Sequence, residues 1–194
     1  MKNTQFNQTR LKLNRYGVKI SSELNTKIRL VIKQKNYQSD LEQNVHGIAG
    51  HIYLVNQYLL KKVEKLNALL HEGLVNHECE YFESDFTLVD TMLSVSIFKI
   101  KSCFEFDIPV YSSLEELELK LAVQLKQLID LSKNVPHAYA NNYLTEMKVI
   151  PGIKLDIYQL IFFAMKHSEH HLNQISTLTK IKEVFDNGQL VEYP

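Results

Sequence analysis

Apolar residues recur every three or four positions over long stretches of this chain, which is the spacing of one face of an α-helix. The pattern predicts four long helices separated by polar or irregular segments. These helices are expected at about residues 18–35, 40–71, 113–132 and 154–184. The apolar stripe of the second helix consists of Ile48, Ile52, Val55, Leu59, Val63, Leu66 and Leu70.

Residues typical of helix ends support two of these starts. Asp40 with Gln43, and Ser113 with Glu116, have the spacing of a capping box. In that motif the side chain of the first residue accepts a hydrogen bond from the backbone N–H of the second. Gly73 follows the second helix, where glycine commonly ends a helix.

Residues 74–112 keep no helical period and are rich in β-branched and aromatic residues. They are expected to form a long, partly irregular connection or a short hairpin, although Pro109 disfavours a central strand. The whole pattern predicts an all-α fold and one domain over residues 1–194. That fold is a helix bundle with a long connection between its second and third helices, and residues 1–17 are expected to be a frayed N-terminal extension.

Composition and charge narrow the class of protein. Apolar residues make up 45% of the chain and charged residues 23%, as in soluble globular proteins. Lys+Arg and Asp+Glu both number 22, so the formal net charge is zero, which argues against a nucleic-acid binder. The N-terminal basic residues stand among Asn, Gln and Thr and indicate a solvated segment; they are Lys2, Arg10, Lys12, Arg15 and Lys19.

Three further features bear on location. No stretch approaches the roughly 18 apolar residues of a membrane span. The opening sequence MKNTQFNQTR lacks the apolar region of a secretory signal. Cys79 and Cys103 are predicted to be reduced thiols. A cytoplasmic protein with no membrane partner is therefore expected.

Three histidines lie within five positions near the end of the chain, in the segment HSEHHLNQI. His167 and His171 are four residues apart, so in a helix they lie one turn apart on the same face. They extend an apolar stripe formed by Leu160, Phe163, Ala164, Ile175 and Leu178. The pair is therefore expected to point inward, where an unpaired polar group costs about 1–3 kcal/mol. Hydrogen bonds or one shared divalent cation could satisfy both rings.

His51 is the best candidate for a third ligand, because it lies beside the apolar stripe of the second helix. Gly47 and Gly50 precede it. Glycine inside a helix costs about 1 kcal/mol relative to alanine, so close helix approach or room for a ligand is expected there. Three neutral nitrogens would leave coordination positions open, as in catalytic metal sites.

The segment from His167 to Ile175 resembles the H-x-x-H-H-x-x-Q-I signature on the last helix of the DinB-like superfamily, a family of small bacterial metal-binding bundles. VHGIAGHIYLVNQYLL resembles the second-helix segment of that family, and the likeness extends to the helix order and to the GIKLD entry of the fourth helix. The resemblance implies a four-helix bundle that holds a divalent metal, commonly nickel, zinc or iron, through His51, His167 and His171. It also implies a homodimer and a small-molecule substrate such as a thiol, since relatives include thiol S-transferases and a thiol-dependent isomerase. The long 74–112 connection departs from the better-known transferases.

Other polar residues have more ordinary interpretations. His170 is expected to play an outer-shell or helix-packing role, and Gln174 either orients a ring or is an ordinary polar residue. His71, His77 and Cys79 form a rival cluster whose spacing fits no common zinc pattern. The remaining candidates are set aside: His46 lies about 140° around the helix from His51, His137 is expected in a loop, and Tyr58 in the core.

Two hypotheses about function follow. In the first, the chain is a metal-dependent hydrolase or thiol S-transferase that uses a metal-activated water or thiolate. In the second, it is a non-catalytic metal-binding or structural bundle. A third and weaker hypothesis is a helical interaction module that binds no metal.

Overall fold

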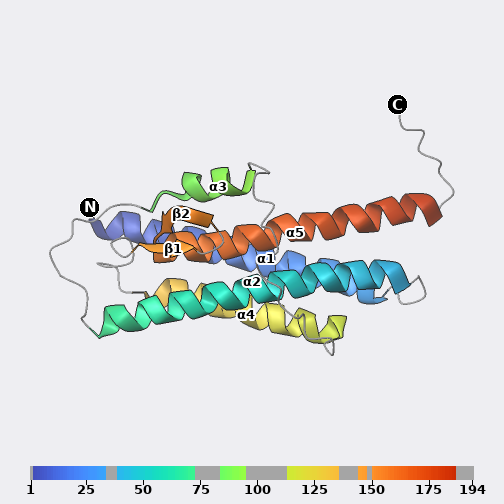
Figure 1. Cartoon of the computed structure of the whole chain (residues 1–194), viewed down its shortest axis with the longest axis horizontal. Coiled ribbons are helices and arrows are strands. Elements are labelled where there is room, and N and C mark those ends of the chain that lie inside the picture. The colour runs from blue at the N-terminus through green and yellow to red at the C-terminus, as the bar shows by residue number, and fades with distance from the viewer. Residues whose placement is uncertain are drawn as a thin grey trace.

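The computed structural model of the chain describes residues 2–33, 39–72, 84–94, 113–135, 144–147 and 150–186. This part of the chain is mostly helical, with one small antiparallel sheet (Figure 1). In chain order the elements are α1 (Lys2–Lys33), α2 (Ser39–His71), α3 (Phe86–Ser94), α4 (Leu114–Asn134), β1 (Thr145–Met147), β2 (Ile150–Leu155) and α5 (Ile157–Asp186).

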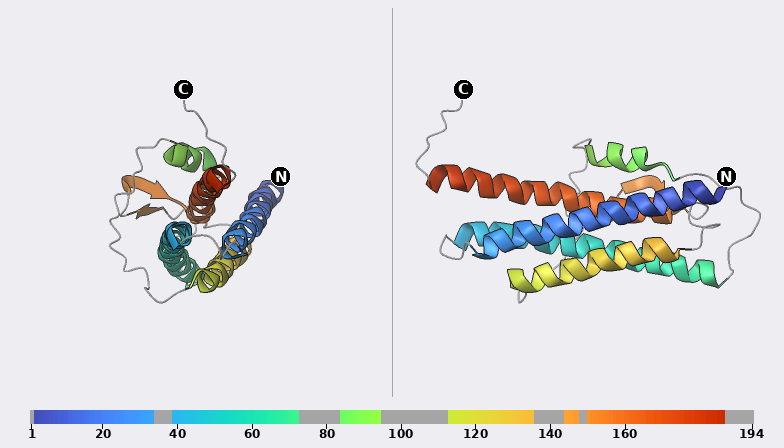
Figure 2. Two further views of the ribbon diagram at one scale, coloured as in Figure 1. Left: turned by 90° about the vertical axis from the view of Figure 1, so that its right-hand side faces the viewer. Right: turned by 180° about the vertical axis from the view of Figure 1, so that it is seen from behind.

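Four long helices, α1, α2, α4 and α5, pack side by side. In end view they occupy the corners of a square in the order α1, α4, α2, α5 (Figure 2). The helices α1 and α5 run in one direction, and α2 and α4 run in the other (Figure 1). Each helix therefore has one parallel and one antiparallel neighbour. The consecutive pairs α1 and α2, and α4 and α5, stand at opposite corners, whereas α2 and α4 are neighbours.

The core forms where the apolar stripes of these helices face one another. Burial of these side chains, worth about 25 cal/mol per Å² of apolar surface, is the main force that holds the helices together. The stripes expected for the second and third helices are confirmed in large part. The buried residues of α2 include Val45, Ala49, Ile52, Val55, Leu59, Val63 and Leu66, and those of α4 include Leu114, Leu117, Leu121, Leu125 and Leu128.

The beginning of α5 is buried on all sides. Every residue from Ile157 to Met165 is buried, whereas a helix at a protein surface buries only one stripe. The short helix α3 accounts for part of this burial because it packs on α5, with the rings of Phe86 and Phe162 4.6 Å apart between centroids (Figure 1). The expectation that residues 74–112 lack helix is therefore wrong for α3. Residues 73–83 and 95–112 lie outside the described part.

The first helix begins at Lys2 and not near residue 18, so the expected frayed extension over residues 1–17 is wrong. Leu13 is completely buried in the core. Two of the basic side chains that suggested a solvated segment instead bind other elements. Arg10 donates hydrogen bonds to the Val135 carbonyl and the Tyr158 hydroxyl, and Lys19 forms a 3.0 Å ion pair with Glu169.

The fourth predicted helix begins later than expected, because residues 154 and 155 belong to a strand. β2 pairs with β1 in an antiparallel hairpin that the apolar pattern did not indicate. The helix α5 then starts behind a reciprocal cap. The Gln159 N–H donates to Asp156 Oδ1 at 2.8 Å, and the Asp156 N–H donates to Gln159 Oε1 at 2.9 Å.

The expected cap of α4 is confirmed, since Ser113 Oγ accepts a 3.2 Å hydrogen bond from the Glu116 N–H. The second helix starts at Ser39, one residue before the expected Asp40. Among the described helices, none is both long and apolar enough to cross a membrane.

Gly17 marks a close approach of α1 to α4 and α5. A Cβ atom at this position would lie 2.6 Å from Ile129 Cγ1 and 2.8 Å from Met165 Cε. We expect Gly17→Ala to lower the free energy of unfolding by about 1–2 kcal/mol, because overpacking outweighs the gain in helix propensity. Gly47→Ala is the matched control: a Cβ there meets nothing within 4 Å, so this variant should gain stability in the same urea titration.

Asp156 generates a prediction about pH. Burial raises the pKa of its carboxyl to about 6, against hydrogen bonds from the Gln159 and Tyr158 backbone and from Ser84 that lower it. Because the pKa is higher in the folded state, the protonated form favours folding, and this contribution is lost as pH rises through about 6. We expect the free energy of unfolding to fall between about pH 4 and pH 6, by at most about 3 kcal/mol.

Asp156→Asn should keep the helix cap and remove this pH dependence, which denaturation at several pH values would measure. Asp156→Ala is the control for the cap itself and should be about 1 kcal/mol less stable than Asp156→Asn at every pH. An unchanged pH profile in the Asn variant would show that another group is responsible.

Candidate metal centre

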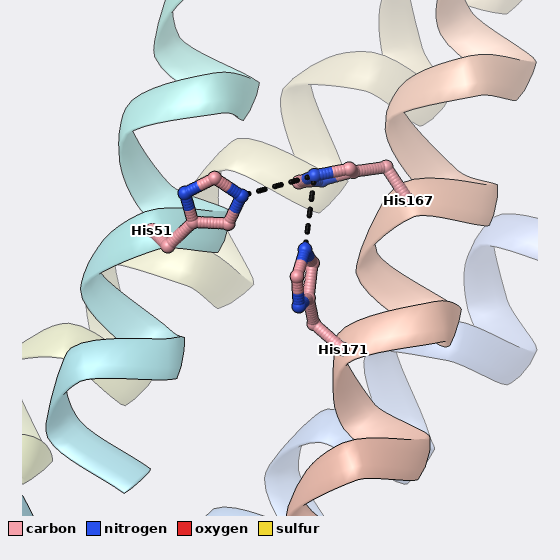
Figure 3. Close-up of side chains that lie close together, drawn as sticks. All are labelled: His51, His167 and His171. Carbon is pink, nitrogen blue, oxygen red and sulfur yellow. Dashed lines mark hydrogen bonds between the residues drawn. The ribbon is translucent and has the colours of Figure 1, made fainter. Parts of the chain in front are cut away.

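His51, His167 and His171 come together between α2 and α5. His51 projects from α2, and the other two project from consecutive turns of α5 (Figure 3). The spacing predicted that His167 and His171 share a helix face, and the structure places them there. His167 is only 2% exposed, while His51 and His171 are half-buried. The cluster therefore has a buried side and a side that reaches solvent.

The three Nε2 atoms converge on one point. His167 Nε2 lies 3.2 Å from His51 Nε2 and 3.1 Å from His171 Nε2 (Figure 3). Two nitrogens that each bind one ion at about 2.0–2.1 Å can be no more than about 4.2 Å apart. The two separations that involve His167 meet that limit, and the ligand atoms of all three residues lie within 4.8 Å of one another. The three side chains are thus close enough to hold a metal ion.

Burial keeps these rings neutral. It lowers the pKa of His51, it lowers that of His171 to about 4, and it lowers that of His167 well below the ordinary value. The neighbouring imidazoles lower the pKa of His167 further. Neutral imidazole offers a lone pair on one nitrogen, which is the form that binds metal.

Gln174 fixes which nitrogen of His171 carries the proton. Its amide nitrogen lies 3.3 Å from His170 Nε2, so its carbonyl Oε1 faces His171 Nδ1 at 2.8 Å. A carbonyl oxygen only accepts, so His171 Nδ1 is the donor. The Nε2 atom of the neutral His171 ring therefore presents a lone pair to the centre of the cluster.

No placement of protons then satisfies the contacts of His167 with both neighbours. If His167 Nε2 is unprotonated, two lone pairs face each other at 3.1 Å across the contact with His171. If it is protonated, its single hydrogen serves His171 or His51 but not both. One cation that accepts a lone pair from each ring removes the conflict. The donor set therefore fits a divalent metal.

Two details complete the surroundings of His167. Its Nδ1 atom is buried and has no hydrogen-bond partner among the described residues. The next residue, Ser168, is fully buried and accepts a 3.1 Å hydrogen bond from Asn56 Nδ2 of α2. This pair joins the two helices beside the histidines. The apolar pattern did not indicate this pair. A polar residue next to a predicted ligand, on a helix expected to point inward, could have indicated it.

The other candidates occupy different positions. His170 is exposed, with its ring edge against His171 at 5.3 Å between centroids, and it does not belong to the cluster. His46 also stands outside the cluster, and Tyr58 packs against the core as expected. The His77, Cys79, Cys103 and His137 positions and the His71 side chain lie outside what the structure describes. A Cβ at Gly47 would meet open space, so close helix approach does not explain that glycine.

Comparison of the chain with protein-family models, with curated proteins and with solved structures gave no match. The assignment of the site therefore rests on the geometry and chemistry of the three histidines.

Proposed function

We propose that this chain binds a divalent metal ion through His51, His167 and His171. In this proposal the protein is a hydrolase or a thiol S-transferase that depends on the ion. The observation that carries the proposal is the convergence of three neutral imidazole nitrogens at 3.1–3.2 Å around His167. The likeness of the two histidine segments to the DinB-like superfamily supports the same assignment. On that likeness we also propose a bundle of the DinB-like type, a homodimer, and nickel, zinc or iron as the metal.

A divalent ion bound at such a site supplies Lewis acidity, which lowers the pKa of a coordinated water or thiol and yields an anion at neutral pH. The ligands of this chain favour that role because all three are uncharged. Among the described residues, the cluster contains no Asp or Glu that would cancel part of the charge of the ion. The substrate in this proposal is a small molecule such as a thiol.

The residues around the ligands hold them in place. Gln174 orients the His171 ring through its 2.8 Å hydrogen bond, and the Asn56–Ser168 pair fixes α2 against α5. Burial of His167 keeps water from the inner side of the cluster. An incoming ligand therefore approaches from the side of His51 and His171, where the rings are partly exposed.

Replacement of any one of the three histidines by alanine should remove most of the bound metal, because the two imidazoles that remain bind an ion much more weakly than three. We expect less than about a tenth of the metal content of the unaltered protein, with the helical content retained. Elemental analysis of protein purified without a histidine tag and circular dichroism would measure the two quantities.

His46→Ala is the matched control, since it removes an imidazole from the same helix as His51 but outside the cluster. It should keep its metal. Stoichiometric metal in His171→Ala would refute the assignment of the ligands.

Chelation separates a catalytic site from the structural alternative. The apolar core extends along all four long helices, so we expect the metal-free protein to remain folded. Removal of metal should lower the melting temperature only by the amount that ligand binding adds to stability. Calorimetry with and without a chelator would measure it. Global unfolding on chelation would favour a structural role for the ion.

A further inference from the structure

Gly47 occupies an unusual position for a glycine, in the interior of α2 and one turn before His51. Residues four apart in a helix lie on the same face, so position 47 borders the face that carries the His51 ring. Because α2 and α5 are antiparallel neighbours, this turn of α2 lies toward His171 and Gln174 rather than toward the start of α5 (Figure 1). Gly47 is partly exposed and lies one helical turn from His51, which is also partly exposed.

The space beside Gly47 is open. A Cβ atom there would meet no heavy atom within 4 Å, whereas at Gly17 it would lie 2.6 Å from Ile129 Cγ1. Packing therefore requires glycine at position 17 and does not require it at position 47. Helix propensity favours alanine at an interior helix position. The absence of a side chain at Gly47 has its clearest effect on the space next to His51.

The exposure of the polar residues shows which side of the histidine cluster reaches solvent. His167 is almost completely buried, His51 and His171 are partly exposed, and His170 and Gln174 are exposed. The cluster thus reaches solvent on the side of His51 and His171, and Gly47 is itself partly exposed one turn from His51. Exogenous ligands of the proposed metal ion have to enter from this side.

We propose that Gly47 keeps open the path by which small molecules reach the histidine cluster, and that it sets the size of the ligands admitted. This inference rests on the proposed metal site. The ligands concerned are small donors such as thiolates, imidazole or azide, which can take a coordination position that the three histidines leave open.

The test uses the full chain loaded with Co²⁺, whose visible absorption spectrum changes when an exogenous ligand binds. Gly47→Ala and Gly47→Leu are compared with Glu42→Leu. Glu42 is an exposed residue of the same helix, about 140° around from position 47, so its replacement adds the same side chain away from the cluster. Imidazole serves as the larger probe and azide as the smaller one. Cobalt content and melting temperature are measured for each variant.

We expect all three variants to bind cobalt at the same stoichiometry as the unaltered protein. Gly47→Ala should melt about 2–4 °C higher in the metal-free form, from its gain in helix propensity. Gly47→Leu should bind imidazole about tenfold more weakly, because its side chain occupies the entry path, and should lose less affinity for azide. Glu42→Leu should bind both probes normally.

Each contrary result has a distinct meaning. If Gly47→Leu holds cobalt and binds imidazole as tightly as the unaltered protein, the path lies elsewhere and the inference fails. Loss of cobalt from Gly47→Ala would also overturn it, because the glycine would then be needed for the ligands themselves. If the unaltered protein binds no cobalt, the metal site fails, and the inference fails with it.

Discussion

The site depends on a restriction of the imidazole ring: each nitrogen either carries a proton or offers a lone pair, and it cannot do both at once. His167 Nε2 faces two other imidazole nitrogens within hydrogen-bond distance, and Gln174 commits one of those rings to presenting a lone pair. Without an ion, one of the two contacts of His167 Nε2 either brings two lone pairs together or lacks a hydrogen bond. A single positive ion at the centre satisfies the whole set, which is why the arrangement favours metal over an ordinary hydrogen-bonded core.

This restriction acts only because the surrounding structure holds the rings in place. The start of α5, from Ile157 to Met165, is buried on every side, which anchors the helix that carries two of the histidines. Asn56 and Ser168 form a buried hydrogen bond between α2 and α5 next to His167. A displacement of α2 by one helical turn, about 5.4 Å, would separate His51 from its partners. The polar pair and the apolar stripes therefore fix the same register.

The sequence predicted the parts of this molecule that follow from a simple period. The 3–4 spacing located α2 and α4, and the i, i+4 spacing of His167 and His171 placed both on one face of α5. It failed where tertiary contacts override local composition. Residues 1–17 are mostly polar and basic, yet α1 extends to Lys2. Arg10 binds other elements, and so does Lys19 just beyond this segment. The hairpin and α3 are too short to show a period, and they are held by packing against longer elements.

The candidate site was predictable because its ligands are histidines on apolar stripes. The distances between α2 and α5 were not predictable, since no local pattern fixes the register of two helices that are far apart in the chain. The role of Gln174 was open between orienting a ring and ordinary surface polarity. Only the position of its amide relative to both His170 and His171 shows that it holds the ring.

The diagonal placement of α1 and α2, and of α4 and α5, has a consequence for biosynthesis. Few contacts join α1 to α2 or α4 to α5, and the neighbours α2 and α4 run in the same direction, so none of these consecutive pairs forms an antiparallel hairpin as it leaves the ribosome. Their partners lie far along the chain, and His51 and His167 are 116 residues apart. Two of the three nitrogens belong to α5, the last of the described helices along the chain. An ion held by all three rings can therefore bind only after α5 has been synthesised.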